Sequence, residues 1–512
     1  MKMKWIILGT ILLLSFFIRA WQLDKNPAGF FCDEASIGYN AYSIFKTGKD
    51  EWGVTFPLFF KAFGEYKNPV FIYSSIPSIA LFGLNEFSLR LTSVLYGTLT
   101  ILVLYLWLRK LFDENTAVWG SFFLAISPWH IHFSRVGFEL ISSVFWVSLS
   151  FYLLYKSFAN ILIYPFGAIS LLISYFTYSP PKIYLPILFL FFFIIYYKKL
   201  VVLIKHKFIW FISLLIFLLF VILLLPSIQD NSFWARWVQV RQGELTIDFL
   251  RQAYLNHFSF DFLFSKGDID FSGQFITRHS IRGMGELYWI QLPFIMVSLS
   301  LLFNSKMRKG ALFFILFLLI YPLGSVFTSI APQATRSVVG VIPFQVLTAL
   351  GITAFLSYFK NKLLRKTLML FLIVTIVLSF SNFINLYKKY PNYSSDYWGW
   401  QYGPKEIMAY FLKNSGKYDE MFMSGEFNAG EIFLSFYDPE GTCKNKCKMG
   451  QLRDTPELYD PVKRQLFSMG PDYLTNSKFK DNFIIKHTIR YPDGKVAFFI
   501  GEVKKGTRLE ML

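Results

Sequence analysis

Apolar stretches, most of them long enough to form a membrane-spanning helix, recur along this chain up to position 386. The stretch 183–197 is short for a span. A run of about 20 apolar residues is what an α-helix needs to cross the roughly 30 Å hydrocarbon core of a bilayer. Segment 69–83 is also apolar, but it is short and contains Pro69 and Pro77, so we interpret it as an interfacial or re-entrant helix. Eleven stretches are predicted to span the membrane: 5–23, 87–108, 117–134, 140–156, 161–178, 183–197, 208–226, 287–303, 311–328, 338–358 and 367–386.

The composition supports a polytopic α-helical membrane protein. Hydrophobic residues make up 54% of the 512 residues, and charged residues only 16%, against about 25% in soluble domains. One water-soluble core cannot bury that much apolar surface. The first stretch lacks a small-x-small cleavage site, so we expect it to be a retained span and not a signal peptide.

The placement of Lys and Arg predicts the orientation of the chain. Basic residues gather in the loops that lie inside if the N-terminus is inside, where Asp113 and Glu114 are the only acids. This bias accounts for much of the net charge of +18 without a nucleic-acid partner. The inside residues are Lys2, Lys4, Arg109, Lys110, Lys156, Lys198, Lys199, Lys205, Lys207, Lys306, Arg308, Lys309, Lys360, Lys362, Arg365 and Lys366.

The chain divides into a transmembrane domain over 1–389 and a tail over 390–512. The transmembrane domain has two long outside loops, 24–68 and 227–286. Eleven spans leave the tail outside, and its mixed polarity, with a helix over 404–414 and strands over 483–489 and 496–500, predicts a small α/β domain. Cys443 and Cys447 in the tail are either a disulfide or two free thiols.

Asp33 and Glu34 are the strongest candidates for chemistry. They follow the first span by about ten residues and are flanked by aromatic residues close to the membrane. Partial desolvation in such a place raises the pKa of a carboxylate and makes it a better base. A second interpretation stays open, in which Asp33 caps a helix over 34–47.

Lys67 ends the same loop, after Glu65 and Tyr66, just ahead of the predicted interfacial helix. An ammonium group at this depth is suited to a lipid phosphate, although a lysine here is also typical of snorkelling to the membrane surface. We include Glu65 and Tyr66 as possible substrate-binding residues.

Further cationic candidates lie at the outer ends of later spans. Arg135 and Glu139 fall in the turn between the third and fourth spans, where they either serve a substrate or pair with one another. Arg336 lies at the mouth of the tenth span, where an arginine usually faces a polar cavity or an anion. The second long loop adds Arg278, His279 and Arg282, which are also compatible with a solvated face.

No motif indicates nucleotide or metal chemistry. The sequence has no Walker loop, GxGxxG, HExxH or GxSxG pattern. His130 and His132 are two residues apart, so on a helix they face different ways, and no metal ligands are predicted.

Taken in order, these residues resemble the GT-C superfamily of membrane glycosyltransferases. The resemblance is strongest to glycosyltransferase family 39, with its protein O-mannosyltransferases, and to the lipid A aminoarabinose transferases. It runs over about 1–390 and is carried by the first span, Asp33-Glu34, the segments 66–69 and 85–91, and Ser127-Pro128 through Arg135.

The resemblance implies inverting transfer of a sugar from a polyprenyl phosphate to a hydroxyl acceptor on the outer face of the membrane. Asp33 would be the base and Glu34 would position the acceptor or share that role. Lys67, Arg135 and Arg336 would bind the donor phosphate, and Glu65, Tyr66, Glu139, Arg278 and Arg282 are possible substrate ligands. The acceptor would be a lipid, a protein or a polysaccharide of the cell envelope, so that protein glycosylation is one of the possible outcomes. The location would be the cell (cytoplasmic) membrane.

The pattern departs from these relatives in ways that keep alternatives open. Relatives often have an acid immediately before the lysine and a second proline after it, whereas Tyr66 and Asn68 occupy those places here. No cofactor is therefore assigned, and a divalent cation stays open. The alternatives are an oligosaccharide transferase that uses a diphosphate lipid and a lipid or solute transporter.

Overall fold

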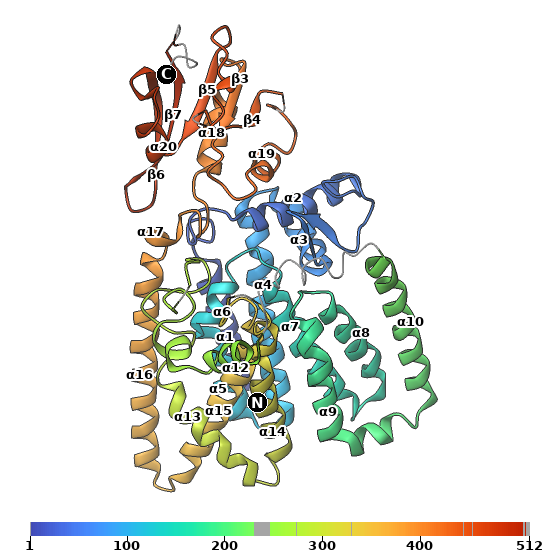
Figure 1. Cartoon of the computed structure of the whole chain (residues 1–512). Helices are drawn as coiled ribbons and strands as arrows, with labels where there is room; N and C mark the ends of the chain where they lie inside the picture. Colours follow the sequence, from blue (N-terminus) through green and yellow to red (C-terminus); the bar gives the residue numbers. More distant parts are fainter. Residues whose placement is uncertain are drawn as a thin grey trace.

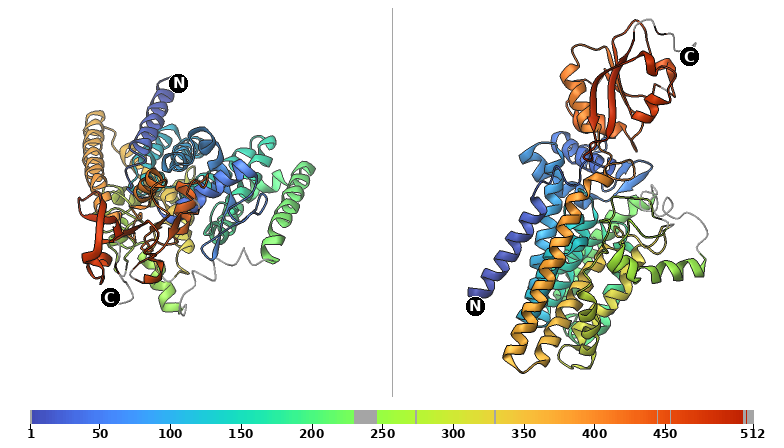
Figure 2. Two further views of the ribbon diagram at one scale, coloured as in Figure 1. Left: turned by 90° about the horizontal axis from the view of Figure 1, so that it is seen from above. Right: turned by 90° about the vertical axis from the view of Figure 1, so that its left-hand side faces the viewer.

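The computed structural model describes residues 2–229, 246–272, 274–328, 330–443, 445–452, 454–504 and 507. A tall bundle of helices carries a small sheet domain at one end, and the N-terminus lies towards the other end (Figure 1). Two further views show the same arrangement (Figure 2). Part of the predicted outside loop, residues 230–245, lies outside the described residues.

Each of the eleven predicted spans contains helix. Among the described residues, six helical segments are long and apolar enough to cross a membrane: α4, α7, α9, α10, α15 with the turn before it, and α16. The exact number of crossings stays a prediction. The bundle consists of α1 (Lys2–Ala20), α4 (Glu86–Leu111), α5 (Glu114–Ile126), α6 (Pro128–Phe133), α7 (Leu140–Ser157), α8 (Tyr164–Tyr175), α9 (Pro181–Leu203), α10 (Lys207–Gln229), α13 (Gln291–Ser298), α14 (Arg308–Ile320), α15 (Val341–Tyr358) and α16 (Lys362–Lys389).

The predicted span 117–134 is broken in two. Helix α5 ends at Ile126 and α6 begins at Pro128, with the Ser127 side chain accepting the backbone N–H of His130. Pro128 has no N–H to donate and occupies the first turn of α6, the helix position that tolerates proline best. The residues after the break therefore turn back into the protein and are buried.

A layer of short elements covers the end of the bundle below the sheet domain. It contains α2 (Cys32–Thr47), an antiparallel pair of strands β1 (Phe60–Ala62) and β2 (Glu65–Lys67), and α3 (Pro69–Phe82). Helix α3 has 14 residues with proline at its first position, and it occupies the place of the predicted interfacial helix. In the second long loop, α12 (Ile247–Asn256) and a π-turn (Asp261–Ser265) precede an irregular segment.

The C-terminal domain is a five-stranded mixed sheet with short helices, as the tail composition predicted. Its strand order is β4-β3-β5-β7-β6, with β3 parallel to both β4 and β5, and β7 antiparallel to β5 and β6. The elements are α17 (Pro391–Ser394), α18 (Pro404–Asn414), β3 (Glu420–Met423), α19 (Glu431–Tyr437), β4 (Cys447–Met449), β5 (Gln465–Met469), α20 (Pro471–Thr475), β6 (Phe483–Arg490) and β7 (Val496–Val503).

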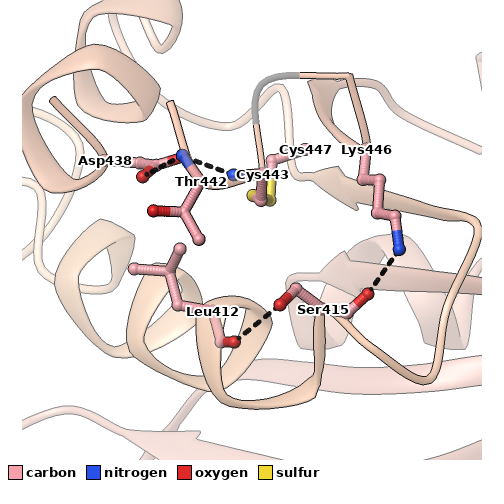
Figure 3. Close-up of a disulfide and its surroundings, with 7 residues drawn as sticks. All are labelled: Leu412, Ser415, Asp438, Thr442, Cys443, Lys446 and Cys447. Carbon is pink, nitrogen blue, oxygen red and sulfur yellow. Dashed lines mark hydrogen bonds between the residues drawn. A yellow bond between two sulfur atoms is a disulfide. The ribbon is translucent and has the colours of Figure 1, made fainter. Parts of the chain in front are cut away.

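A disulfide joins Cys443 to Cys447 between α19 and β4, with the two Cα atoms 5.5 Å apart (Figure 3). The Asp438 carboxylate accepts the backbone N–H groups of Thr442 and Cys443, and the Lys446 ammonium donates to the Ser415 carbonyl. The sequence left open whether these two cysteines form a disulfide or remain free thiols, and the structure has the disulfide.

The C-terminal domain packs directly on α2 and on the loop before it. The rings of Phe30 and Phe436 lie 4.7 Å apart. Gly29 has φ +93°, and a Cβ there would lie 2.4 Å from the Trp400 carbonyl oxygen, so the two backbones approach more closely than any larger residue allows. On α4, the Glu86 carboxylate accepts from the side chains of Lys405 and Tyr437 at 2.6 and 2.7 Å.

Candidate active site

A cavity of about 160 Å³ lies where α2, β2 and the start of α7 meet two loops of the bundle. Seven of the ten site residues that the resemblance implies line it: Asp33, Glu65, Tyr66, Lys67, Glu139, Arg278 and Arg336. Glu34, Arg135 and Arg282 do not line this cavity. The remaining lining residues are Ile37, Asn68, Phe138, Leu140, Tyr178, Ser179, Ile276, His279, Gln333 and Thr335.

Lys67 and Asp33 form the centre of one wall. The Lys67 Nζ lies 2.6 Å from Asp33 Oδ1 and 3.9 Å from Glu65 Oε1. Burial opposes a charge on Lys67, but Asp33 and Glu139 outweigh it and raise the pKa of the ammonium. Lys67 is 5% exposed, so its charge is held inside the cavity and does not snorkel to the surface. Asp33 is about one-third exposed and open to a substrate.

Glu34 has a different position from its neighbour. Both carboxylate oxygens accept from the Arg90 guanidinium at 2.9 Å, and both side chains are fully buried. Glu34 also accepts the backbone N–H groups of Gly137 at 2.6 Å and Phe31 at 3.3 Å. This geometry does not support a share of the base role for Glu34, because the carboxylate is enclosed by donors and does not reach the cavity.

The capping interpretation of Asp33 also changes. Helix α2 has Phe31 as its N-cap residue, and the carboxylate that returns to the cap N–H belongs to Glu34. Asp33 lies in the first turn with its side chain directed to Lys67. The carboxylate-rich start of α2 is therefore divided: Glu34 fixes the helix, and Asp33 faces the cavity.

Arg135 holds the end of the first span. Its guanidinium donates to five backbone carbonyls between residues 18 and 26, at 2.7 to 3.3 Å. It therefore neither pairs with Glu139 nor faces the cavity, and the predicted phosphate contact is not supported. Arg282 lies outside the cavity too, half exposed, with its Nε 3.0 Å from Asp270 Oδ1.

Glu139 precedes α7 and lines the cavity beside Lys67. Its Oε1 accepts the backbone N–H of Asn68 at 2.5 Å, which ties the start of α7 to the strand β2 and its lysine. Burial raises the pKa of Glu139 to about 7, against the opposing effects of Lys67 and the Asn68 N–H. This carboxyl therefore changes charge near neutral pH.

A cationic wall of the cavity comes from two loops. The Arg278 guanidinium lies 3.9 Å from the centre of the Phe31 ring and donates to the Trp398 carbonyl at 2.6 Å. Arg336 interacts with the Tyr178 hydroxyl, and burial lowers the pKa of its guanidinium. Tyr178 was not predicted as a site residue, because nothing in the local sequence distinguishes it from the many tyrosines of the spans.

The described residues contain no group of three or more His, Cys, Asp or Glu side chains placed to hold a metal ion. Instead, the Lys67 ammonium lies between the carboxylates of Asp33 and Glu65.

An apolar cavity of about 420 Å³ lies between α8, α9 and α10. Its wall includes Tyr175 at the end of α8 and Phe220 of α10, whose rings are 5.1 Å apart. Three residues after Tyr175, Tyr178 lines the polar cavity. The other lining residues are Tyr164, Ala168, Leu171, Leu172, Leu185, Pro186, Phe189, Ser213, Ile216 and Phe217.

Comparison with known proteins gives one family match and one curated relative. The model of the family described as dolichyl-phosphate-mannose-protein mannosyltransferase matches residues 67–225. The dolichyl-phosphooligosaccharide-protein glycotransferase 2 of Pyrococcus horikoshii is 34% identical over 102 residues, which are 19% of this chain and 13% of that protein. The chain thus matches about an eighth of the relative's length.

Solved structures match over far more of the chain. The apo form of the Archaeoglobus fulgidus oligosaccharyltransferase aligns with a TM-score of 0.55 at 14% identity, covering 85% of this chain and 64% of that one. ArnT from Cupriavidus metallidurans, bound to undecaprenyl phosphate, aligns with a TM-score of 0.53 at 12% identity and 97% coverage of both chains. The predicted resemblance is confirmed: the chain is an integral membrane protein with the GT-C fold.

Proposed function

We propose that this GT-C chain transfers a sugar from a polyprenyl-phosphate donor to a hydroxyl acceptor, with inversion at the anomeric carbon. The observation that carries the proposal is the cavity in which Asp33 faces Lys67, Arg278 and Arg336. One carboxylate and three cations in a single enclosed place suit a reaction that removes a proton from one oxygen and develops negative charge on a phosphate.

In this mechanism Asp33 accepts the proton of the acceptor hydroxyl. The freed oxygen forms a bond to the anomeric carbon while the bond from that carbon to the phosphate oxygen breaks, and the electron pair leaves with the phosphate. Lys67, Arg278 and Arg336 stabilise the departing dianion through charge-assisted hydrogen bonds. The arriving donor phosphate competes with Asp33 for the Lys67 ammonium, so donor binding releases the carboxylate for its role as base.

The apolar cavity between α8, α9 and α10 supports a lipid-linked donor. It is a suitable place for isoprene units, because its walls are aliphatic and aromatic side chains of three neighbouring helices. The segment from Tyr175 to Tyr178 connects it to the polar cavity, so a lipid tail in one place leaves its phosphate close to the other. The undecaprenyl phosphate bound by ArnT is a ligand of this chemical class.

We place the cavity and the C-terminal domain on the outer face of the cell membrane. The basic loops support an inside N-terminus, and the N-terminus and the sheet domain lie towards opposite ends of the bundle (Figure 1). The Cys443–Cys447 disulfide suits an oxidising compartment. The acceptor on that face is a lipid, a protein or a polysaccharide.

Transfer of an oligosaccharide from a diphosphate lipid is the second candidate. The match to the Pyrococcus horikoshii glycotransferase and the fold of the archaeal oligosaccharyltransferase favour it. The carrier recovered after transfer distinguishes the two, because the first reaction releases a lipid monophosphate and the second a lipid diphosphate.

The test is transfer in membranes that contain the full chain. Radiolabelled polyprenyl-phosphate and polyprenyl-diphosphate sugars are supplied, and label is followed into lipid, protein and polysaccharide. We expect wild type to transfer label and Asp33→Asn to lose about 10²- to 10⁴-fold in rate. Asp24→Asn, an exposed carboxylate in the same loop, is the matched control and should transfer normally.

Equal rates for wild type and Asp33→Asn would remove Asp33 from the mechanism. If the folded protein transferred no sugar from any donor of either kind, the result would contradict the proposed glycosyltransferase activity and favour the transporter alternative.

A further inference from the structure

His279 lies between the cavity and a buried carboxylate. Its ring lines the cavity, whereas Asp268 does not, and its Nδ1 lies 3.2 Å from Asp268 Oδ2. The two nitrogens of an imidazole are separated by one carbon, and their N–H bonds or lone pairs point in different directions. Nδ1 is buried beside Asp268, so Nε2 is the nitrogen left to meet a ligand in the cavity.

Asp268 is fixed by both loops of the cationic wall. It is fully buried, and its Oδ2 also accepts the backbone N–H of Ala334 at 2.8 Å, two residues before Arg336. The Trp129 indole donates to the Ala334 carbonyl at 3.0 Å. The carboxylate thus lies beside the His279 imidazole of one loop and holds the arginine-bearing segment of the other.

The surroundings decide the charge of the imidazole. Asp268 favours a proton on Nδ1, and the charged groups Arg278 and Arg336, with His132 on α6, disfavour a second one. Burial is the largest effect and lowers the pKa of His279. At neutral pH the ring is therefore uncharged. We assign its single proton to Nδ1, the nitrogen beside the Asp268 carboxylate, which leaves Nε2 as a neutral hydrogen-bond acceptor.

We propose, on the basis of the proposed glycosyl transfer, that His279 binds a hydroxyl of the transferred sugar through Nε2 and so contributes to sugar specificity. Arg278 and Arg336 beside it have only N–H donors, which suit the phosphate oxygens. A neutral acceptor cannot bind an ionised phosphate oxygen, but it can accept from an O–H. Because the sugar is joined to the phosphate through its anomeric carbon, the hydroxyl next to that carbon lies beside the ligands of the phosphate.

A sugar that lacks this hydroxyl leaves the buried Nε2 without a partner. The loss of one such hydrogen bond corresponds to about a 10- to 100-fold lower kcat/KM. His279→Ala removes the acceptor and should abolish most of this discrimination, whereas His279→Gln keeps an acceptor oxygen and should retain part of it. Binding of the phosphate and removal of the acceptor proton belong to other residues, so a lower rate with unchanged discrimination would indicate a merely structural role.

The first test is chemical protection of the full chain in lipid nanodiscs. Diethyl pyrocarbonate acylates neutral imidazole, and mass spectrometry reports the modification of each histidine. Polyprenyl phosphate and polyprenyl-phosphate mannose, glucose and galactose are the probes. We expect at least one sugar-bearing lipid to slow modification of His279 about fivefold or more beyond polyprenyl phosphate alone, in line with one hydrogen bond to the sugar. His487, which stacks on Tyr410 in the sheet domain, is the internal control and should not respond.

The second test compares the best-used sugar with its 2-deoxy analogue in wild type, His279→Gln and His279→Ala. Discrimination that falls in that order supports the inference. Equal protection by the bare lipid and every sugar lipid, or full discrimination in His279→Ala, would overturn it while leaving the glycosyltransferase intact. Failure of the proposed function has a separate signature, in which wild type transfers no sugar and no lipid, sugar-bearing or bare, protects His279.

Discussion

The buried ion pair between Glu34 and Arg90 predicts how firmly the start of α2 is held. Replacement of Glu34 by Gln keeps the shape of the side chain but leaves the Arg90 charge buried without its counter-charge. Removal of one partner of such a pair costs about 3 to 5 kcal/mol. Since about 1.4 kcal/mol is a factor of ten in an equilibrium, local opening at the start of α2 should become at least about 100-fold more frequent.

Cys32 is a built-in reporter of this opening. It begins α2, is 1% exposed, and is free, whereas the other two cysteines of the chain are joined to one another. Burial raises the pKa of the Cys32 thiol, so a maleimide reacts with it only when the helix start opens. The assay follows by mass spectrometry the addition of one maleimide to purified, non-reduced protein over time.

We expect labelling of Glu34→Gln to be about two orders of magnitude faster than labelling of wild type, as the lower bound of the ion-pair cost requires. The matched control is Glu114→Gln, which breaks the partly exposed pair with Arg109 at 3.0 Å and should change labelling little. A rate for Glu34→Gln within about threefold of wild type, which corresponds to less than about 1 kcal/mol, would refute the reasoning.

Four other predictions concern the cavity and the C-terminal domain. Because the pKa of Glu139 is raised to about 7, the KM for the donor should rise above pH 7 as this carboxyl becomes negative beside the phosphate, and Glu139→Gln should flatten that rise. The same raised pKa means that Glu139 binds its proton more tightly in the folded state than in the unfolded state. Its contribution to the free energy of unfolding is therefore present at acidic pH and is lost as the pH rises to about 7, which thermal unfolding across that range measures. Phe436→Ala removes a fully buried ring and should cost about 3 to 5 kcal/mol of packing, seen as faster proteolysis between residues 395 and 403, whereas Ile484→Ala on the exposed face of β6 should not change it. The denatured chain should take up one maleimide without reductant and three with it; three without reductant would contradict the bond between Cys443 and Cys447.

The helices and most of the cavity residues could be predicted from the sequence, because each has a signal in a single segment of the chain. Apolar runs of membrane-spanning length are a signal of single segments, and each of the eleven contains helix. The same patterning could not show that Pro128 divides one predicted span into α5 and a buried α6. Asp33, Lys67 and Arg336 were identifiable because they are charged residues in outside segments close to apolar, predicted membrane helices, and all three line one cavity.

The division of work between neighbouring charges could not be predicted. Asp33 and Glu34 are adjacent in sequence, yet successive residues of a helix point in different directions. Asp33 therefore faces the cavity and Glu34 faces Arg90. Arg135 is a residue type that often binds phosphate, but its guanidinium donates to backbone carbonyls of the first span. His279 lies beside Asp268, eleven residues earlier in an irregular loop, where no periodic pattern links the two.

The packing of the C-terminal domain on α2 sets an order of events in the life of the protein. The helix that carries Asp33 leaves the ribosome long before the tail, but the ring that covers its outer face, Phe436, belongs to the tail and is made after the predicted spans. Newly inserted chains therefore contain the spans and the cavity residues before the layer above them is complete. Maturation of the site is a late step, governed by folding of the tail, and a chain that ends after the last span contains every cavity residue without the surface that holds their helix in place.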